Sequence, residues 1–232
     1  MITKKLLAVV LLTGIGIASK AQFYVQGGVN LANITNTNNG QTEKNHLLTT
    51  FNAGVLGRFG ISDMFDLESG ALLSGKGAKA ETYFNGGADY IKSKFNPLYI
   101  EIPLNAVIKF PLEVKSKSNI FVHAGPYLGI GIAGKSTSDS KFGPLSASSS
   151  SDIKFSNDDP FTSQQDDAAY NKLKRFDFGV NVGGGIDFGK FLLKVNYGIG
   201  MAKINSTQSN NTVNDKNKFR TLSISAGIKL GR

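Results

Sequence analysis

Apolar and polar residues alternate along eight segments of this chain. In the last segment, apolar residues occupy every second position from Leu222 to Leu230, and in the fourth they do so from Leu98 to Phe110. A period of two is typical of a β-strand whose two faces meet different surroundings. The segments, each of about ten to fourteen residues, are Phe23–Ile34, Phe51–Ile61, Phe65–Lys76, Leu98–Phe110, Ile120–Ala133, Phe176–Phe188, Phe191–Lys203 and Arg220–Leu230.

The gaps between these segments alternate in length. The long gaps are residues 35–50, 77–97, 134–175 and 204–219, and the short ones are 62–64, 111–119 and 189–190. In an up-and-down antiparallel array, this order places all the long loops at one end. Outer-membrane barrels have short periplasmic turns and long external loops. We therefore predict an all-β fold, an eight-stranded antiparallel up-and-down transmembrane β-barrel. A soluble β-sandwich with the apolar faces inside is the alternative, because alternation alone does not choose.

Phenylalanines gather on the apolar face at the short-turn ends of the segments. They are Phe23, Phe59, Phe65, Phe110, Phe188 and Phe191. Aromatic rings at one level are typical of the girdle at a membrane interface, whereas the core of a sandwich has no reason to collect them at one end. Phe51, Phe176 and Phe178 are candidates for the opposite girdle. The chain has no Trp, so the predicted girdles depend on Phe.

The polar positions of the same segments predict the interior of the barrel. The charged and titratable ones are Arg58, Glu68, Glu101, Lys109, His123, Asp177, Asp187, Lys194 and Lys229. Eight strands enclose a space just wide enough for side chains. Arg58 and Glu68 flank a short turn, so we expect an ion pair across that hairpin. We therefore predict a lumen plugged by a structural polar network rather than an open pore.

The first residues have the organisation of a secretory signal peptide. Lys4 and Lys5 precede an apolar run over residues 6–17, and Ser19 and Ala21 supply small residues before a cleavage site. We predict residues 1–21 as the signal and residues 22–232 as the barrel domain. Loss of three lysines lowers the formal charge from +9 to +6. The basic residues are scattered and the chain is exported, so we expect outer-membrane lipid and lipopolysaccharide as partners, and no nucleic acid.

Several motifs together resemble the PorT-like, porin-family outer-membrane β-barrel domain of Gram-negative bacteria. The resemblance covers nearly all of the mature chain, and its most specific element is Tyr99-Ile-Glu-Ile-Pro-Leu104. The other carriers are the segments 51–60, 67–77, 125–129, 177–185 and 222–230. The resemblance implies an outer-membrane barrel without shared catalytic residues. Some members serve a secretion machine, which implies envelope or secretion-machine proteins as possible partners and leaves the oligomeric state open.

The chain offers little for catalysis or for binding a cofactor. It has no Cys. The segment from Gly129 to Ser136 matches the spacing of a P-loop, but no helix signal follows it, and we interpret it as a Gly-rich strand. His46 and His123 are predicted at opposite ends of the barrel. Only His46, with an external Ser or Asp, remains a candidate for a lipid-modifying enzyme or protease at the rim.

The longest loop, residues 134–175, contains ten Ser and six Asp. This composition favours a mobile, solvated chain, and its paired aspartates lack the spacing of a calcium loop. We therefore expect no catalytic residue, no cofactor and no metal. The function predicted from the sequence is a non-enzymatic structural or interaction platform in the outer membrane that works through its external loops. A narrow solute channel is the first alternative, and the rim enzyme is the second.

Overall fold

A computed structural model describes residues 21–38, 41–43, 46–112, 118–156, 172–204 and 217–230. The signal peptide, predicted for residues 1–21, lies outside the described residues except for Ala21, and it stays a prediction. The elements in chain order are β1 (Ala21–Asn38), β2 (Gln41–Glu43), β3 (Leu48–Gly60), β4 (Phe65–Gly75), β5 (Ala78–Phe84), the 3₁₀ turn η1 (Asn85–Gly87), β6 (Asp89–Pro111), β7 (Asn119–Phe142), β8 (Leu145–Asp152), β9 (Lys154–Ser156), β10 (Lys172–Lys174), β11 (Phe176–Asp187), β12 (Phe191–Gly200) and β13 (Lys218–Leu230).

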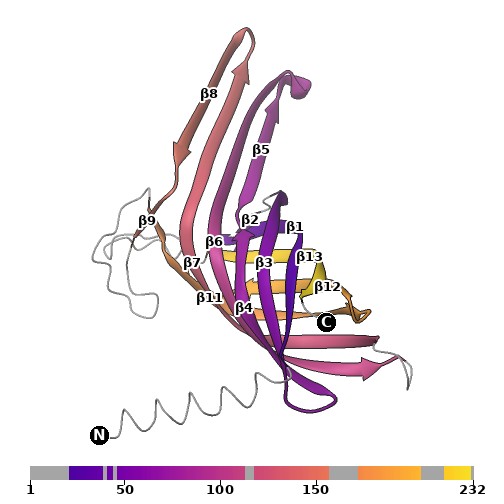
Figure 1. The fold of residues 1–232 in the computed structure, drawn as a ribbon. Helices are drawn as coiled ribbons and strands as arrows, with labels where there is room; N and C mark the ends of the chain where they lie inside the picture. The colour runs from indigo at the N-terminus through magenta and orange to yellow at the C-terminus, as the bar shows by residue number, and fades with distance from the viewer. Residues whose placement is uncertain are drawn as a thin grey trace, which may run out of the picture.

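Eight long strands close into an antiparallel barrel (Figure 1). The order around it is β1, β3, β4, β6, β7, β11, β12 and β13, so every neighbour follows in sequence once the short strands are set aside. The barrel closes between the first and last strands, where Phe23 pairs with Leu230 and Thr35 with Lys218. The predicted eight-stranded up-and-down barrel is therefore confirmed. No helix in the described ranges is long and apolar enough to cross a membrane.

The barrel wall has its apolar side chains outside and its polar side chains inside. Ile224, Leu193 and Leu104 are 56%, 51% and 48% exposed, although they lie near the middle of their strands. Glu68 and Asn30 are completely buried on the opposite face. A soluble sandwich requires the reverse arrangement, because exposing this much contiguous apolar surface to water is unfavourable. The orientation of the two faces therefore excludes the sandwich alternative.

The short turns and the ends of the described chain lie at one end of the barrel. These turns join β3 to β4, β6 to β7 and β11 to β12. Gly189 turns the chain between β11 and β12 with a φ of 83°, a value that favours glycine over residues with a side chain. At the same end, Ala21 pairs with Phe59, and Leu230 pairs with Phe23. The long connections all leave from the other end, as the alternation of gap lengths predicts.

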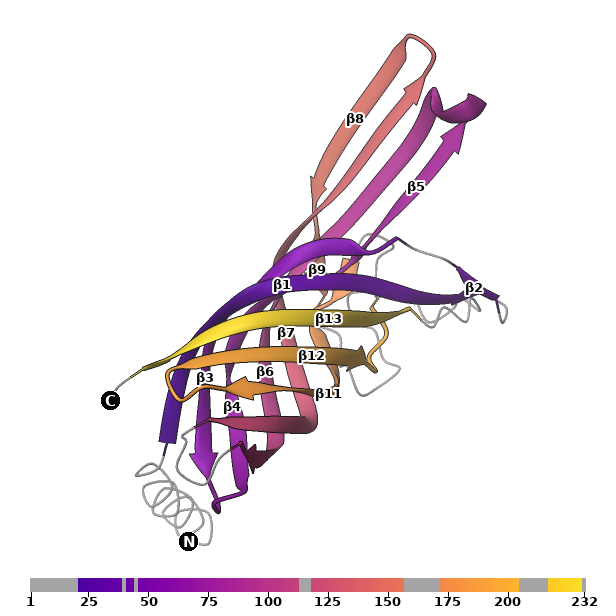
Figure 2. The ribbon, with the colours of Figure 1, turned by 90° about the vertical axis from the view of Figure 1, so that its right-hand side faces the viewer.

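Two of the predicted loops instead contain regular strands. β5 pairs with the first part of β6, and β8 pairs with the last part of β7. Residues 90–97 of β6 also pair with residues 134–141 of β7. The four strands therefore form one sheet that rises beyond the barrel (Figure 2). We call β5, β8 and the paired parts of β6 and β7 the distal sheet. The expectation of loops at residues 77–97 and of mobile chain from 134 is wrong over these strands.

β8 is a strand because of its contact with β7 and not because of its own composition. β8 consists of Leu-Ser-Ala and a run of Ser before Asp152, and this composition has no apolar alternation that marks a strand. Its backbone groups nevertheless pair with those of β7 from Lys135 to Phe142, because the barrel already holds β7 extended. Residues 157–171, which contain the paired aspartates, lie outside the described residues.

Candidate functional site

The layer of the interior nearer the short turns centres on Glu68. Its carboxylate accepts a hydrogen bond from Arg58 Nε at 2.9 Å and contacts Lys194 Nζ, and Asn105 donates to it at 3.0 Å. Arg58, Glu68 and Asn105 come from the neighbouring strands β3, β4 and β6, and Lys194 comes from β12 on the opposite side of the barrel. The ion pair expected between Arg58 and Glu68 is present. Because Glu68 is fully buried, these partners offset the cost of removing its charge from water.

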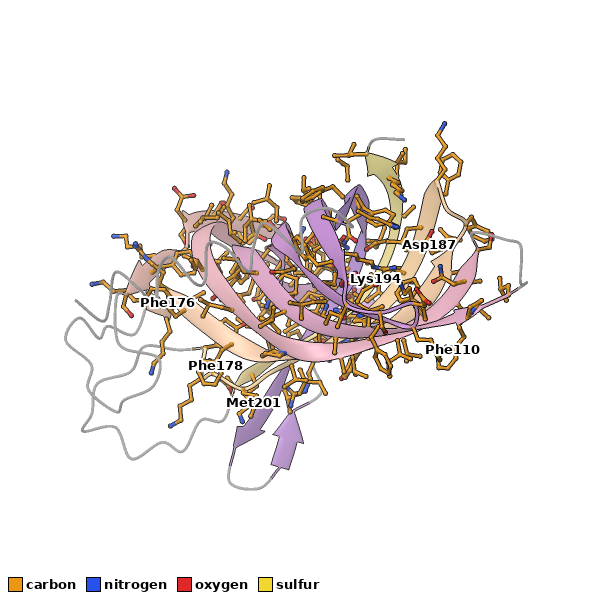
Figure 3. All side chains as sticks on the ribbon, turned by 60° about the horizontal axis from the view of Figure 1, so that its bottom comes forward. Phe110, Phe176, Phe178, Asp187, Lys194 and Met201 are labelled. Atoms are coloured by element: carbon orange, nitrogen blue, oxygen red, sulfur yellow. The ribbon has the colours of Figure 1, made fainter. Side chains whose placement is uncertain are left out.

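Arg58 also connects this layer to the aromatic side chains of the interior. Its guanidinium carbon lies 3.9 Å from the centre of the Phe121 ring and 5.6 Å from that of Tyr24, distances typical of cation–π contacts. Its Nη1 is 3.7 Å from Asp187, which accepts a hydrogen bond from the Tyr24 hydroxyl at 2.8 Å. Lys194 and Asp187 are both buried, and they lie in the half of the barrel that carries Phe110 (Figure 3). The short-turn half of the interior is thus filled by one connected network.

A second layer, nearer the distal sheet, is organised by Lys76. Its ammonium group lies 3.0 Å from Glu101 and 2.7 Å from Asp177, and 4.2 Å from the centre of the Tyr127 ring. The Tyr127 hydroxyl donates to Asp177 at 3.0 Å, and Asn181 donates to Glu101 at 3.2 Å. One cation therefore compensates two carboxylates, and the side chain of Lys76 is only 2% exposed.

Amide and hydroxyl groups lie between the two layers. Asn52 donates to Asn30 at 2.7 Å, and Asn30 donates to Ser74 at 3.2 Å. Ser225 donates to Asn52 at 2.8 Å. The cavity among these groups, lined also by Gln26, has a volume of about 30 Å³. A cavity of this size holds only a few water molecules, so polar side chains fill most of the centre of the barrel.

The remaining predicted interior residues lie away from the two layers. Lys109 contacts Asp66 at 2.6 Å and is partly exposed at the short-turn rim. His123 is buried, and its Nε2 is 2.9 Å from the side-chain oxygen of Asn196. Lys229 is half-buried on the inner face and has no ion pair with a described residue. All nine predicted residues face the interior, but these three take no part in the ion pairs of the two layers.

An apolar cluster closes the long-loop end of the interior. Tyr99, Leu173, Ile204 and Phe219 are buried together, and Phe155 packs edge-on against Tyr99 with ring centres 5.7 Å apart. Phe155 and Leu173 belong to β9 and β10, a short parallel pair that folds back over the mouth. The sequence prediction of a solvated loop here missed these residues. Two isolated apolar residues in a polar segment were the available signal.

Lys76 and three buried tyrosines are interior residues that were not among those predicted. Lys76 lies eight residues after Glu68, so the period of two already assigns it to the inner face. Tyr24, Tyr99 and Tyr127 alternate with outward-facing apolar neighbours in the same way. The prediction selected charged residues within the segments and passed over a lysine at the segment end. Which carboxylates Lys76 meets depends on β6 and β11, and only the closed barrel brings these strands to it.

The six predicted girdle phenylalanines are all on the outer face. Phe23, Phe65, Phe110, Phe188 and Phe191 are 45–53% exposed, and Phe59 is half-buried by its edge contact with Phe23. Phe110 lies at the end of the barrel opposite to Phe176 and Phe178 (Figure 3). A role at a membrane interface stays a prediction for these residues.

The distal sheet has large exposed apolar side chains at its tip. They are Tyr83, Phe84, Ile91, Phe142 and Leu145, and their exposed fractions run from 37% to 75%. Phe84 and Phe142 belong to different hairpins, and their rings pack with centres 6.0 Å apart. The tip therefore combines the two hairpins into one surface.

Asp89 joins the two hairpins through its carboxylate. It accepts a hydrogen bond from the backbone N–H of Gly143 at 2.6 Å and another from Asn85. These hydrogen bonds, first that from Gly143, lower the pKa of Asp89 below its usual value. Among the described residues, no group of three His, Asp or Glu side chains is placed to hold a metal ion.

The match to known families covers most of this barrel. Residues 17–206 match the family model described as outer membrane protein beta-barrel domain. The chain belongs to this family. It is therefore an outer-membrane protein, and the apolar outer face of its barrel is the face that contacts lipid. No curated protein matches the chain.

Solved structures of outer-membrane proteins resemble this barrel at low sequence identity. Ail, the attachment invasion locus protein of Yersinia pestis, is 11% identical, with a TM-score of 0.38, over 90% of this chain and 99% of that chain. Neisserial surface protein A is 14% identical, with a TM-score of 0.38 and the same two coverages. OprG from Pseudomonas aeruginosa is 15% identical, with a TM-score of 0.38, over 91% of this chain and 97% of that chain.

Proposed function

We propose that this protein is a non-enzymatic platform in the outer membrane, with a plugged lumen and with the distal sheet as its working surface. The observation that carries the proposal is the filled interior. Two layers of paired charges fill most of the lumen, and an apolar cluster lies across its external mouth. The cavity left between the layers is only about 30 Å³, so a solute has no room to pass. This arrangement argues against the narrow channel.

The tip of the distal sheet supports an interaction role. Its exposed aromatic and aliphatic side chains lie on strands that rise beyond the barrel, so the surrounding lipid does not account for their exposure. Apolar patches on a water-facing surface commonly mark sites of association. A rim enzyme lacks support, since among the described residues no hydrogen bond joins the His46 side chain to a Ser or Asp, and its backbone pairs with that of Lys79.

The resemblance to PorT-like proteins belongs to the same proposal. It is supported by the segment from Tyr99 to Leu104, which contributes Tyr99 to the apolar cluster and Glu101 to the Lys76 layer. A PorT-like protein would meet envelope or secretion-machine proteins at its ends. We include such proteins, with lipopolysaccharide, as the proposed partners.

Planar-bilayer recording of the purified, folded chain tests the plugged lumen. We expect no steady conductance steps from the wild type. The variant Lys76→Ala removes a long side chain and the charge that holds two carboxylates together, but the Glu68 layer and the apolar cluster remain, so it should stay closed as well. Steady steps from the wild type would establish the channel and reject the platform.

Site-specific photo-crosslinking in intact cells tests the working surface. A photoreactive phenylalanine analogue at Phe84 or Phe142 should give a discrete adduct to an envelope component. The same analogue at Ile102, on the lipid-facing wall, is the matched control. If the two tip positions give no adduct beyond that of Ile102, the distal sheet is not the working surface.

A further inference from the structure

The outer side of the distal sheet continues the lipid-facing wall of the barrel. On β6, Lys94 lies four residues beyond Leu98, on the same side of the strand. At about 3.3 Å per residue and a tilt of about 40°, Lys94 lies about 10 Å further along the barrel axis than Leu98. This is the depth at which lipid phosphates follow the hydrocarbon of the outer leaflet.

Three lysines meet at this level on three neighbouring strands. Lys79 of β5 is directly opposite Lys94 of β6, and Lys135 of β7 is opposite Asn96, two residues from Lys94. We call Lys79, Lys94 and Lys135 the basal lysines. Directly opposed like charges destabilise a strand pair. This unfavourable pair lies at the base of the distal sheet, where an anion between the two ammonium groups would turn repulsion into attraction.

The neighbouring carboxylates compensate these charges only in part. Lys79 is 3.1 Å from Glu81, and this contact, with a hydrogen bond from Tyr83, lowers the pKa of Glu81. Asp152 is opposite Lys135 in the register of β8. Lys94 and Lys135 have no ion pair with any described residue. The side chain of Lys79 is 41% exposed, and Lys94 and Lys135 are exposed as well, so all three can reach a ligand from outside.

The opposite side of the barrel repeats this change from apolar to basic. On the outward positions of β13, Leu222 is followed towards the external end by Arg220 and Lys218. The external rim is therefore basic on both sides of the barrel, directly above the apolar wall. Charge complementarity favours an anionic lipid over a neutral one at this level.

We propose that the basal lysines bind the phosphate groups of lipid A in the surrounding outer leaflet. The inference rests on the proposed function in one respect, the placement of the distal sheet outside the cell. Lysine ammonium groups bind phosphate by charge-assisted hydrogen bonds, and the aliphatic part of each side chain covers apolar surface below. Bound phosphate would relieve the repulsion between Lys79 and Lys94 and hold the base of the distal sheet against the membrane.

Binding of purified lipids to the folded mature chain tests this proposal. The probes are lipid A, lipid A from which the phosphates have been removed, and phosphatidylglycerol, each added to the protein in detergent micelles and followed by native mass spectrometry. We expect lipid A to bind more tightly than either of the other lipids. The double variant Lys79→Gln, Lys94→Gln should bind lipid A about 30-fold more weakly. This loss corresponds to about 2 kcal/mol of binding free energy, the magnitude expected for two lysines at an anionic surface.

The matched control removes the same charge elsewhere. In Lys141→Gln, Lys190→Gln, one change is at the tip of the distal sheet and the other in a short turn at the opposite end. This variant should bind lipid A with the affinity of the wild type. If both double variants lose the same affinity for lipid A, the effect comes from net charge alone and the proposal is wrong.

Two further outcomes decide against it without any variant. If lipid A binds equally well after removal of its phosphates, the contact is with acyl chains. If phosphatidylglycerol competes on equal terms, the basal lysines do not select lipid A. Neither result bears on conductance or on the adducts at the tip, so failure here is distinguishable from failure of the platform function.

Discussion

The substitution Lys76→Met removes the cation that holds together the interior layer nearer the distal sheet. Lys76 is 2% exposed and contacts Glu101 at 3.0 Å and Asp177 at 2.7 Å, and both carboxylates are at most 10% exposed. The methionine side chain is unbranched like that of lysine and only one atom shorter, so packing changes little. What changes is that two buried carboxylates lose their counter-charge. Removal of one partner from a buried ion pair costs about 3–5 kcal/mol, and we expect a loss of free energy of unfolding in that range.

A triple variant separates charge compensation from packing. In Lys76→Met, Glu101→Gln, Asp177→Asn, the carboxylates become neutral amides that still accept hydrogen bonds from Tyr127 and Asn181. Replacement of a whole buried ionic group is often neutral, so the triple variant should recover most of the loss and lie within about 1–2 kcal/mol of the wild type. Lys229→Met is the control for loss of an inward-facing lysine without an ion pair and should change stability by less than about 0.5 kcal/mol.

The measurement is urea unfolding of the mature chain in phospholipid vesicles. The folded fraction is the fraction with altered mobility in unheated gel samples, because the chain has no Trp to report on folding. Linear extrapolation then yields the free energy of unfolding. A loss below about 1 kcal/mol in Lys76→Met, or a triple variant no more stable than the single one, would refute the account of the buried charges.

Three further predictions concern the wall, the strand contacts and the distal sheet. Ile224→Arg should cost about 2–4 kcal/mol in the same assay, whereas Met201→Arg, equally exposed but at the external rim, should cost at most about 1 kcal/mol; equal costs would contradict the membrane placement. Gly125→Ala should reduce stability by about 1–3 kcal/mol, because its Cβ would lie 2.0 Å from the backbone oxygen of Leu104, while Gly129→Ala, whose Cβ has contacts of 3.4 Å or more, should be tolerated. Asp89 has a lowered pKa, so its bond to Gly143 stabilises the folded hairpins above the unfolded-state pKa of about 3.9 and is lost as the pH falls through the folded value. Protection of the Gly143 amide from hydrogen exchange should therefore decrease in acid in the wild type. In Asp89→Asn, the exchange rate divided by the intrinsic rate should not change with pH in acid.

The pattern of the sequence was sufficient for the barrel itself. A period of two at segments such as Leu98–Phe110 and Arg220–Leu230 marks the strands, since side chains of a strand point alternately to its two faces. The alternation of gap lengths then orders the strands around the barrel. The same period assigned Arg58, Glu68 and Lys194 to one face, and the short turn between β3 and β4 made the pairing of the first two predictable. These features depend on residues that are close together in the chain, so the sequence alone was enough to predict them.

Tertiary structure decided the contacts that join distant strands. Lys76 meets Glu101 and Asp177 only because closure brings β4, β6 and β11 around one axis, and the sequence does not state the stagger between those strands. The Ser-rich β8 became a strand because β7 offered it an extended partner, although its own composition favours loop. Phe155 and Leu173 close the mouth because the barrel end presents Tyr99 to them. In each case the decisive partner is far away in the chain, so the sequence determined which face each residue occupies, and the closed barrel determined what it meets there.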